Sequence, residues 1–372
     1  MNIRFADDTD LDALGRLNLR LREGGRQEQI SLATKLPGEA SYTHESLPVY
    51  RRIMVADDGQ EIRAAALLYH GSISIQGVTR KFCWLDMPIS EGIVDRRFSS
   101  AIVHLMRSAL KYQPFLLAIG GATPGTEAHR FFLGLGWKAS AVPFLFYPVR
   151  LTKVLLGLNY IKNNPKLRYP ALICAYSGLA AVGTGISTLR RRFGAPLSAY
   201  QVSLEETFGD WADGVFEDAV SDYSAAVRSN ATALNIHYPP DDPRYIRIRV
   251  KERSSGRDVG WLVVLNKQMN DNKYFGDLKV GTLANGFGRT ADVPVLISAG
   301  LDYLAQAGSD LVVGNFSHKA WIAAARRLNM LSGPSNFYFF ASRGASPLME
   351  ESLPVQDIHL VRGHADGVFS LV

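Results

Sequence analysis

The sequence predicts an α+β fold, of layered α/β type, built from two tandem domains that are each a mixed, mostly antiparallel sheet flanked by helices. The chain has 372 residues, about twice the length of a typical domain. Hydrophobic residues make up 47% and charged residues 20%, an ordinary globular mixture that excludes disordered and fibrous classes. One order of strands and helices also occurs twice, at an offset of about 195 residues.

The first half begins with a short strand at 3–5 and a helix whose apolar positions recur at helical spacing. Asp8, Thr9 or Asp10 is expected to cap that helix. Three strands at 51–57, 64–75 and 81–87 then predict an antiparallel meander. A helix over about 98–112, a strand at 115–120, a helix at 126–135 ending before Gly136 and a strand at 143–149 complete the half.

The second half follows the same order. Tyr245 opens a strand hairpin similar to the one that Tyr50 opens, and the segments 294–308, 310–316 and 318–330 mirror the later helix, strand and helix of the first half. We therefore expect domains at 1–150 and 199–345, a linker at 151–198 and a C-terminal tail at 346–372.

The linker contains an uncharged stretch, Tyr169–Leu189, with basic residues on both sides. Its 21 residues meet the minimum for a membrane span, but Pro170 and three glycines make its transfer into lipid marginal. Three interpretations stay open: a helix packed between the domains, which is favoured, a peripheral membrane contact through 151–193, and a true span.

Charge and cysteine content restrict the partners and the compartment. The net charge of +6 favours anionic partners, but no basic block alternates with aromatic residues, so DNA is not expected. Cys83 and Cys174 each lie in an apolar run, and no spacing of His, Cys and Asp suggests a metal site. The acidic N-terminus does not read as a signal peptide. A cytoplasmic protein, with the option of a peripheral position at the inner membrane, is the expectation.

Two motifs carry a family resemblance. The segment 95–101 contains Arg96-x-x-Ser99-x-Ala101, and the helix that follows the next strand has Ala128, Gly136 and Trp137 at matching positions. Over about residues 1–150 the chain thus resembles the GNAT superfamily of N-acetyltransferases, whose pattern Q/R-x-x-G-x-G/A lies between its fourth strand and the next helix. Here serine and alanine replace the glycines, and Phe132 stands where many members have a tyrosine.

The resemblance implies a site for acetyl-CoA or another acyl-CoA as co-substrate. Its pyrophosphate would bind at the start of a helix, where backbone N–H groups and the helix dipole attract phosphate, and its pantetheine arm would run along the fourth strand. Asp86 or Glu91 would be the general base, whereas Phe132 cannot supply the proton that the family tyrosine donates. The alternative is a plain amphipathic helix capped by Asp95. The residues expected to bind acyl-CoA are Leu85, Met87, Arg96, Arg97, Ser99, Ser100 and Ala101.

The second half fits the family pattern less well. Its loop at 285–295 has Gly286 and Gly288 before Arg289, and Pro294 opens the next helix, but the terminal helix lacks both the glycine and the tyrosine. We expect a degenerate copy. The tail segment around His359, His364 and Asp366 is similar to the closing segment of GNAT-like proteins of bacterial polysaccharide and sugar-modification loci, although polar residues in a tail are usually solvated.

The sequence therefore predicts an acyltransferase that moves an acetyl or other acyl group from acyl-CoA to an amine or hydroxyl of a small-molecule or glycan-type acceptor. An amino sugar or lipid-linked sugar is the acceptor class to test first. Two alternatives remain: a FemAB-like transferase, which uses aminoacyl-tRNA and for which tRNA would be a partner, and a non-catalytic acyl-CoA-binding or scaffold protein.

Overall fold

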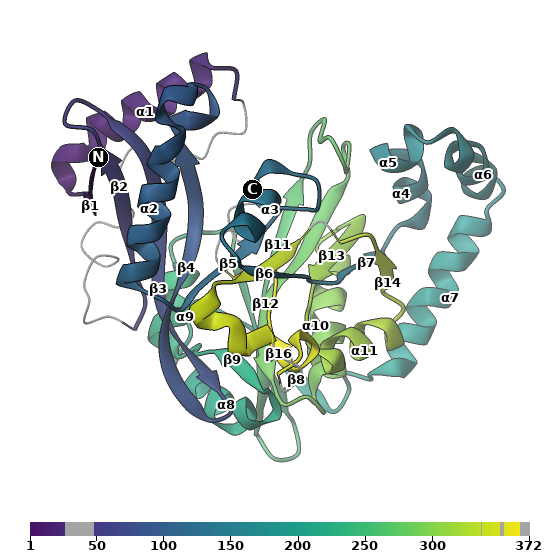
Figure 1. Cartoon of the computed structure of the whole chain (residues 1–372). Coiled ribbons are helices and arrows are strands. Elements are labelled where there is room, and N and C mark those ends of the chain that lie inside the picture. Colours follow the sequence, from purple (N-terminus) through teal and green to yellow (C-terminus); the bar gives the residue numbers. More distant parts are fainter. Residues whose placement is uncertain (27–47, 336, 350–352, 365–372) are drawn as a thin grey trace. The chain divides into compact units, whose positions relative to one another are not determined.

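The computed structural model describes residues 1–26, 48–335, 337–349 and 353–364 (Figure 1). The chain divides into two compact units. Unit 1 consists of Met1–Ser140 and Tyr338–Pro354, and unit 2 consists of Ala141–Phe337 and Val355–Val372. Each unit is therefore discontinuous in the sequence. The segment expected to be a linker, 151–198, lies within unit 2.

Unit 1 contains a mixed sheet in the order β1-β2-β3-β4-β5-β15-β6. The first four strands are antiparallel neighbours, β4 and β5 are parallel, and β15 is antiparallel to β5. The first five of these strands were predicted from the sequence, whereas β15 and the short strand β6 were not. The strands are β1 (Asn2–Phe5), β2 (Tyr50–Asp57), β3 (Ile62–Ile75), β4 (Val78–Ser90), β5 (Leu116–Gly120), β15 (Tyr338–Ala341) and β6 (Lys138–Ala141).

Helices cover both faces of this sheet. Helix α1 (Leu11–Glu23) packs Leu14 and Leu17 against strands β2 and β3 on one face. Helices α2 (Ser99–Tyr112) and α3 (Glu127–Gly134) pack Leu105 and Phe132 against the other face. The short 3-10 helices are η1 (Asp8–Asp10), η2 (Glu91–Ile93), η3 (Arg96–Phe98) and η5 (Arg343–Met349).

The cap of the first helical segment differs from the expectation. Asp7 caps η1, because its side chain accepts the N–H of Thr9. The side chain of Asp10 accepts the N–H of Asp7, which completes a capping box. Asp10 is also held by Arg4 at 2.6 Å. Asp10, one of the three predicted caps, occupies the N-cap position of α1, but its side chain makes no capping hydrogen bond there. The side-chain cap lies earlier, at Asp7, because a 3-10 turn precedes α1.

Unit 2 contains a second mixed sheet, in the order β14-β7-β13-β12-β11-β10-β8. Its order repeats that of unit 1, with one exchange: β7, from the first half of the sequence, lies between β13 and β14, and β15, from the second half, lies between β5 and β6. The strands are β7 (Phe144–Pro148), β8 (Tyr200–Glu205), β10 (Ile246–Glu252), β11 (Asp258–Gln268), β12 (Lys279–Gly288), β13 (Leu311–Asn315) and β14 (Leu331–Gly333).

The helices of unit 2 bury their apolar faces on this sheet. Helix α10 opens with Pro294, as predicted, and is buried along most of its length because it lies against β11 and β12. The other elements around the sheet are α8 (Trp211–Ala219), η4 (Val220–Asp222), α9 (Ala231–His237), α10 (Val293–Gln306), α11 (Lys319–Arg327) and η6 (Val355–Asp357), with the short parallel pair β9 (Ala225–Val227) and β16 (Ile358–His359).

Residues 151–194 form four helices instead of one continuous helix. They are α4 (Leu151–Gly157), α5 (Asn159–Lys162), α6 (Pro165–Tyr176) and α7 (Leu179–Gly194). Helices α6 and α7 meet at a bend of 81°. Among the described residues no single helix is long and apolar enough to cross a bilayer, and only this bent pair reaches the required length and hydropathy when its two helices are taken together.

The C-terminal segment 358–364 is integrated into unit 2. Ser317 donates its N–H to the carbonyl of Leu360, and Phe316 forms a bridge with Val361. The N–H of Gly363 donates to the carbonyl of Ala284 on β12. His359 and His364 are buried, so the expectation of a solvated tail was wrong for both; Asp366 lies outside the described residues.

Buried imidazoles surround this segment. His359 contacts the rings of Tyr223, Phe287 and Trp321, and His318 contacts Tyr223. Burial lowers the pKa of His359 to about 3 and that of His318 to about 4, and it lowers the pKa of His364 well below its usual value. These side chains are therefore neutral in the folded protein at neutral pH.

We predict that acid weakens unit 2 through these histidines. An unfolded imidazole binds a proton below about pH 6.5, whereas the folded His359 does so only near pH 3, so the free energy of unfolding falls as pH drops from 6.5 toward 4. The loss is about 2 kcal/mol per imidazole at pH 5. Urea unfolding at pH 7.5 and pH 5 should show a smaller pH effect in His359→Phe than in the wild type. The exposed control His104→Phe should keep the full effect, and an unchanged pH dependence in His359→Phe would contradict the assignment.

We also predict that Gly363→Ala detaches the tail. A Cβ at Gly363 would lie 2.6 Å from the hydroxyl of Tyr238 and 2.7 Å from the carbonyl oxygen of Ala284. The variant should lose about 1–3 kcal/mol of unfolding free energy in urea titrations. The control Gly214→Ala lies in α8, where an added Cβ would meet no atom within 4 Å, and it should gain about 0.5–1 kcal/mol. Equal stability of the two variants would rule out close packing at Gly363.

Candidate functional site

Strand β4 bulges where the predicted site begins. Leu67 on β3 pairs with Asp86, and Ala65 pairs with Ile89, so three steps along β4 face two steps along β3. The extra residue falls at Met87 or Pro88. A bulge leaves backbone groups out of the ladder and bends its strand. Because Pro88 has no N–H, the only N–H of these two residues is that of Met87.

Strands β4 and β5 also diverge at this point. Their parallel pairing consists of Cys83 with Leu116 and Trp84 with Leu117, and within the described residues it extends no further. Strand β5 continues to Gly120 and pairs with β15 on its other edge. The carboxyl end of β4, from the carbonyl of Leu85 to the bulge, is therefore not paired with β5, and an extended ligand could pair with the backbone there.

Asp86 lies at this diverging end and is buried, with 3% of its surface exposed. Because cross-strand partners share a face of the sheet, Asp86 lies on the same face as Leu67, which packs with α1. Leu85 points to the opposite face, into the cluster under α2. Met87 lies in the bulge, and its side chain is outside the described residues.

Glu91 is held by two cations. Its carboxylate, also buried, accepts from Arg20 at 2.9 Å and from Arg63 at 3.0 Å. These ion pairs join η2 to α1 and β3. The arrangement favours a structural role for Glu91, because both of its oxygens are already occupied.

The segment after β4 enters α2 through the 3-10 turn η3. Arg96, Arg97, Ser99 and Ser100 are exposed, and Ala101 is buried under the helix. Asp95 accepts the backbone N–H of Arg97 and pairs with its guanidinium at 2.6 Å, while the hydroxyl of Ser99 donates to the carbonyl of Arg96. Arg96 forms no ion pair within the described residues. The structure thus brings these predicted residues together at one helix start, with Arg96 as the cation that has no acidic partner there.

Gly92 is a residue that the sequence analysis missed. A Cβ at this position would lie 2.6 Å from the Cα of Ser99 and 2.9 Å from the carbonyl oxygen of Phe98. Only glycine lets the η2 turn approach the start of α2 this closely. The sequence does contain a signal for it, a glycine between the predicted strand and helix, three residues before the segment 95–101 that resembles the family pattern.

The tyrosine position of the family is part of the core. Phe132 is buried against Trp137 and Phe340, with ring centroids 5.0 and 4.7 Å away. Phe132 therefore packs this helix on the sheet. Phe132 has no proton to donate, and neighbouring His129 is held by the carbonyl of Ala122 and the ring of Tyr338.

Cys83 and His70 form a buried pair in the middle of the sheet, 3.1 Å apart. Burial raises the pKa of the Cys83 thiol and lowers the pKa of His70 to about 4. The pair is therefore a neutral thiol and a neutral imidazole, which is not an activated nucleophile. No group of three or more metal-binding side chains exists within the described residues.

The pocket found in unit 1 lies elsewhere. It has a volume of about 350 Å³ and is lined by β1 and by the C-terminal part of α2, including Phe5, Lys111 and Tyr112. The predicted site is at the opposite, N-terminal end of α2. An extended ligand that pairs with backbone needs an open strand edge, which the end of β4 provides.

Unit 2 has the corresponding bulge, and there the C-terminal segment of the chain is hydrogen-bonded to it. On β12, Leu283 pairs with Val264 and Asn285 pairs with Val263, so Ala284 is the extra residue, and the pairing with β13 ends at Leu283. Gly363 donates to the carbonyl of Ala284 and accepts from the hydroxyl of Tyr238. Gly286 and Gly288, which were expected in a loop, lie on β12 itself.

Comparisons with solved structures show the fold. Saccharomyces cerevisiae N-myristoyltransferase with bound myristoyl-CoA has a TM-score of 0.53 and 10% identity, over 91% of this chain and 82% of that chain. The same enzyme with myristoyl-CoA and inhibitors has a TM-score of 0.53 and 13% identity, over 92% of this chain and 79% of that chain. A probable N-acyltransferase from Enterococcus faecalis V583 has a TM-score of 0.52 and 9% identity, over 94% and 74%.

The sequence itself gives no further match. No family model matches the chain, and no curated protein does. The structural neighbours belong to the GNAT-fold superfamily, and two mixed sheets flanked by helices are what the sequence predicted. The predicted fold class is therefore confirmed, and the chain has the fold of these N-acyltransferases.

Proposed function

We propose that this protein is an acyl-CoA-dependent acyltransferase whose unit 1 binds the acyl-CoA. The observation that carries the proposal is the bulged end of β4, which leaves β5 and leads directly into the exposed start of α2 with Arg96 and two serines. Structural neighbours with the same fold were crystallised with myristoyl-CoA, which supports this ligand class. The acyl group that we propose is acetyl or a longer chain.

The residues present suit such a ligand. Arg96 and the first N–H groups of α2 would hold the pyrophosphate, because a helix N-terminus and a guanidinium both favour phosphate. The serines at 99 and 100 add a Cβ where the family has glycine, but their exposed hydroxyls can donate to phosphate. The free backbone along Leu85 and Met87 would hold the pantetheine amides, as an added strand does.

Acyl-CoA supplies the thioester carbon that the acceptor attacks. The acceptor nitrogen or oxygen forms a bond to that carbon, the C–S bond breaks, and the CoA thiolate leaves. Backbone N–H groups beside the bulge would stabilise the developing oxyanion, and Asp86 would take the proton of the acceptor. With phenylalanine at 132, this position provides no acid for the thiolate, so the proton must come from water or from another group.

Unit 2 would serve a different role. We infer that it is a copy of the same fold that takes no acyl-CoA, because the chain's own Gly363 uses the carbonyl at the bulge of β12. The tail that fills this place supports no particular acceptor. An amino sugar or a lipid-linked sugar remains the acceptor class that we propose to test first.

The first prediction of this proposal is binding at the start of α2. Calorimetric titration with acetyl-CoA, myristoyl-CoA and CoA should give micromolar affinity for at least one of them, and Arg96→Ala and Ser99→Glu should each weaken it about tenfold or more. Lys111→Ala, at the exposed far end of the same helix, is the matched control and should bind like the wild type.

Each result of this titration favours one candidate function. Absence of binding at millimolar concentration would reject the acyl-CoA proposal and leave the aminoacyl-tRNA-dependent transferase. Binding that depends on Arg96, without turnover on any amine, amino sugar or hydroxyl acceptor, would favour a non-catalytic acyl-CoA-binding protein. The non-catalytic candidate is supported by Phe132, which is buried and cannot donate a proton to the leaving thiolate.

The second prediction separates the two carboxylates. With the first acceptor that a screen identifies, Asp86→Asn should lower kcat about 100-fold or more, as loss of a general base does. Glu91→Gln should instead lower the free energy of unfolding by ~3 kcal/mol, because it breaks buried ion pairs with Arg20 and Arg63, and should change kcat much less. The reverse pattern would make Glu91 the base.

A further inference from the structure

Helices α6 and α7 have an inverted pattern of burial. The side chains that face the protein are small: Ala171, Ala175 and Ala180 are buried. The large apolar side chains face outward, and several are more than 60% exposed. Large apolar side chains are normally buried, so a contiguous set of exposed ones marks a surface for a partner. Its members are Tyr160, Leu167, Tyr169, Ile173, Tyr176, Leu179, Val182, Ile186 and Leu189.

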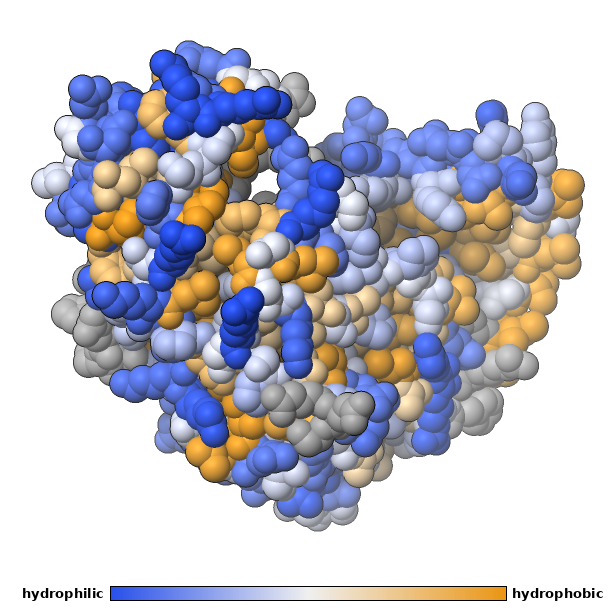
Figure 2. All heavy atoms as spheres, in the orientation of Figure 1, coloured by the Kyte–Doolittle hydropathy of each residue, from blue (hydrophilic) through white to orange (hydrophobic). Residues whose placement is uncertain are grey.

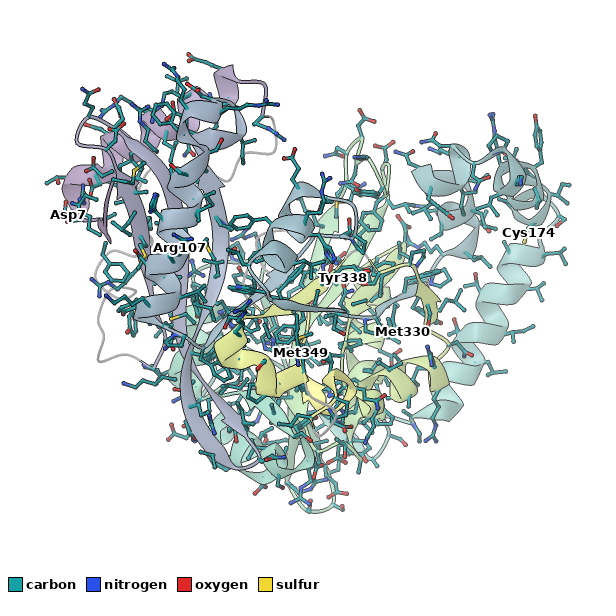
Figure 3. All side chains as sticks on the ribbon, viewed as in Figure 1. Asp7, Arg107, Cys174, Met330, Tyr338 and Met349 are labelled. Atoms are coloured by element: carbon teal, nitrogen blue, oxygen red, sulfur yellow. The ribbon has the colours of Figure 1, made fainter. Side chains whose placement is uncertain are left out.

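These residues form a continuous stripe on each helix. On α6, Tyr169, Ile173 and Tyr176 follow one another at intervals of four and three residues, which is one helix face. On α7, the apolar positions recur at intervals of three, four and three residues: Leu179, Val182, Ile186 and Leu189. Figure 2 shows hydrophobic residues along the right edge of the view, over these two helices, and Figure 3 places Cys174 on α6 beside them.

The charge of the segment is of one sign. From Ala128 to Leu204 the sequence contains no Asp or Glu, and residues 151–194 contain seven Lys and Arg. Lys166 lies three residues before Tyr169, near the N-terminus of α6, so a cation continues that stripe at its N-terminal end. Apolar side chains flanked by cations alone are typical of a helix that lies in the interface of an anionic membrane.

Other occupants fit this pattern less well. A second copy of the chain would bring seven cations against seven cations with no acid in the segment to offset them. The segment is also fixed to unit 2 at both ends, by Val154 of α4 in the cluster with Leu278 and by Gly194 against Leu328. With its 81° bend and these two attachments, it is shaped to lie on a bilayer with the bend inserted, rather than to cross it.

We propose that the surface formed by α5, α6 and α7 binds an anionic lipid bilayer, with the apolar stripes in the boundary between headgroups and acyl chains. The cations around them pair with lipid phosphates. This inference rests on residues 151–194 alone and does not depend on acyl-CoA binding by unit 1. It gives the protein a peripheral position on a membrane and does not itself assign the acceptor.

The test is sedimentation of the full chain with vesicles. Phosphatidylcholine vesicles with about one third phosphatidylglycerol should bind the protein at least about tenfold more strongly than pure phosphatidylcholine, and the difference should shrink in high salt. The triple variant Ile173→Ser, Tyr176→Ser, Leu179→Ser should lose binding to both vesicles. The triple variant Lys162→Gln, Lys166→Gln, Arg168→Gln should bind anionic vesicles more weakly, by up to about 100-fold, and pure phosphatidylcholine vesicles about as the wild type does, so that its preference for anionic vesicles falls.

The matched control is Leu204→Ser with Tyr274→Ser. Both are apolar residues of unit 2 that are 58% exposed and lie outside the stripes, and the double variant should bind vesicles like the wild type. All variants are compared at equal thermal stability and with soluble acyl-CoA titration as a separate readout, which should be unchanged. Binding to neither vesicle, or binding that survives the apolar variant, would overturn the proposal. So would a dimer in light scattering that the apolar variant dissociates while vesicle binding is absent.

Discussion

Both sheets depend on the exchange of one strand between the two halves of the sequence. Buried backbone groups must be hydrogen-bonded, and in unit 1 the outer edge of β5 pairs with β15 and, at Leu116, with Ser342, which follows β15. In unit 2 the edge of β13 obtains its partners from β7. The chain enters unit 2 at Ala141 and leaves it after Phe337. The boundary predicted at residue 150 therefore falls after β7, a strand that already belongs to the sheet of unit 2.

The same backbone irregularity has two uses in this chain. A bulge on the fourth strand of each sheet frees backbone groups where that strand leaves its parallel neighbour. In unit 2 the N–H of Gly363, in the chain's own tail, donates to the carbonyl of Ala284 at the bulge. The carbonyl of Gly363 in turn contacts the hydroxyl of Tyr238 and the imidazole of His237. In unit 1 the bulge leads into an exposed helix start. The difference between the two halves therefore lies in what pairs with the bulged strand, since the sheet order is the same.

Local patterns predicted most of the fold. Alternating apolar residues located the strands of the first meander, and helical spacing of Leu14, Leu17 and Leu21 located α1. The strand β6 was missed because it has only four residues, Lys-Ala-Ser-Ala, and its apolar side chains are alanines, which are too small and too few to indicate a strand. The exchange of β7 and β15 could not be predicted, because a strand's sequence does not specify which of two similar edges it joins.

The site was predicted in part. The positions of Arg96, Ser99 and Ala101 at a helix start follow from the turn and the periodicity, and they are where the sequence placed them. The engagement of Glu91 by Arg20 and Arg63 depends on contacts 71 and 28 residues away in the sequence, which no local pattern reveals. The burial of His359 likewise depends on Tyr223 and Trp321, far away in the chain.

The strand exchange also constrains how the protein is made. As the chain leaves the ribosome, β1 to β5 are complete long before residue 338 emerges, and β5 must wait with one open edge until β15 has been synthesised. Open strand edges recruit other chains, so the nascent first half is exposed to aggregation during this interval. The protein should therefore depend on chaperones that shield unpaired strands, and a gene fragment that encodes only the first half would yield an incomplete sheet.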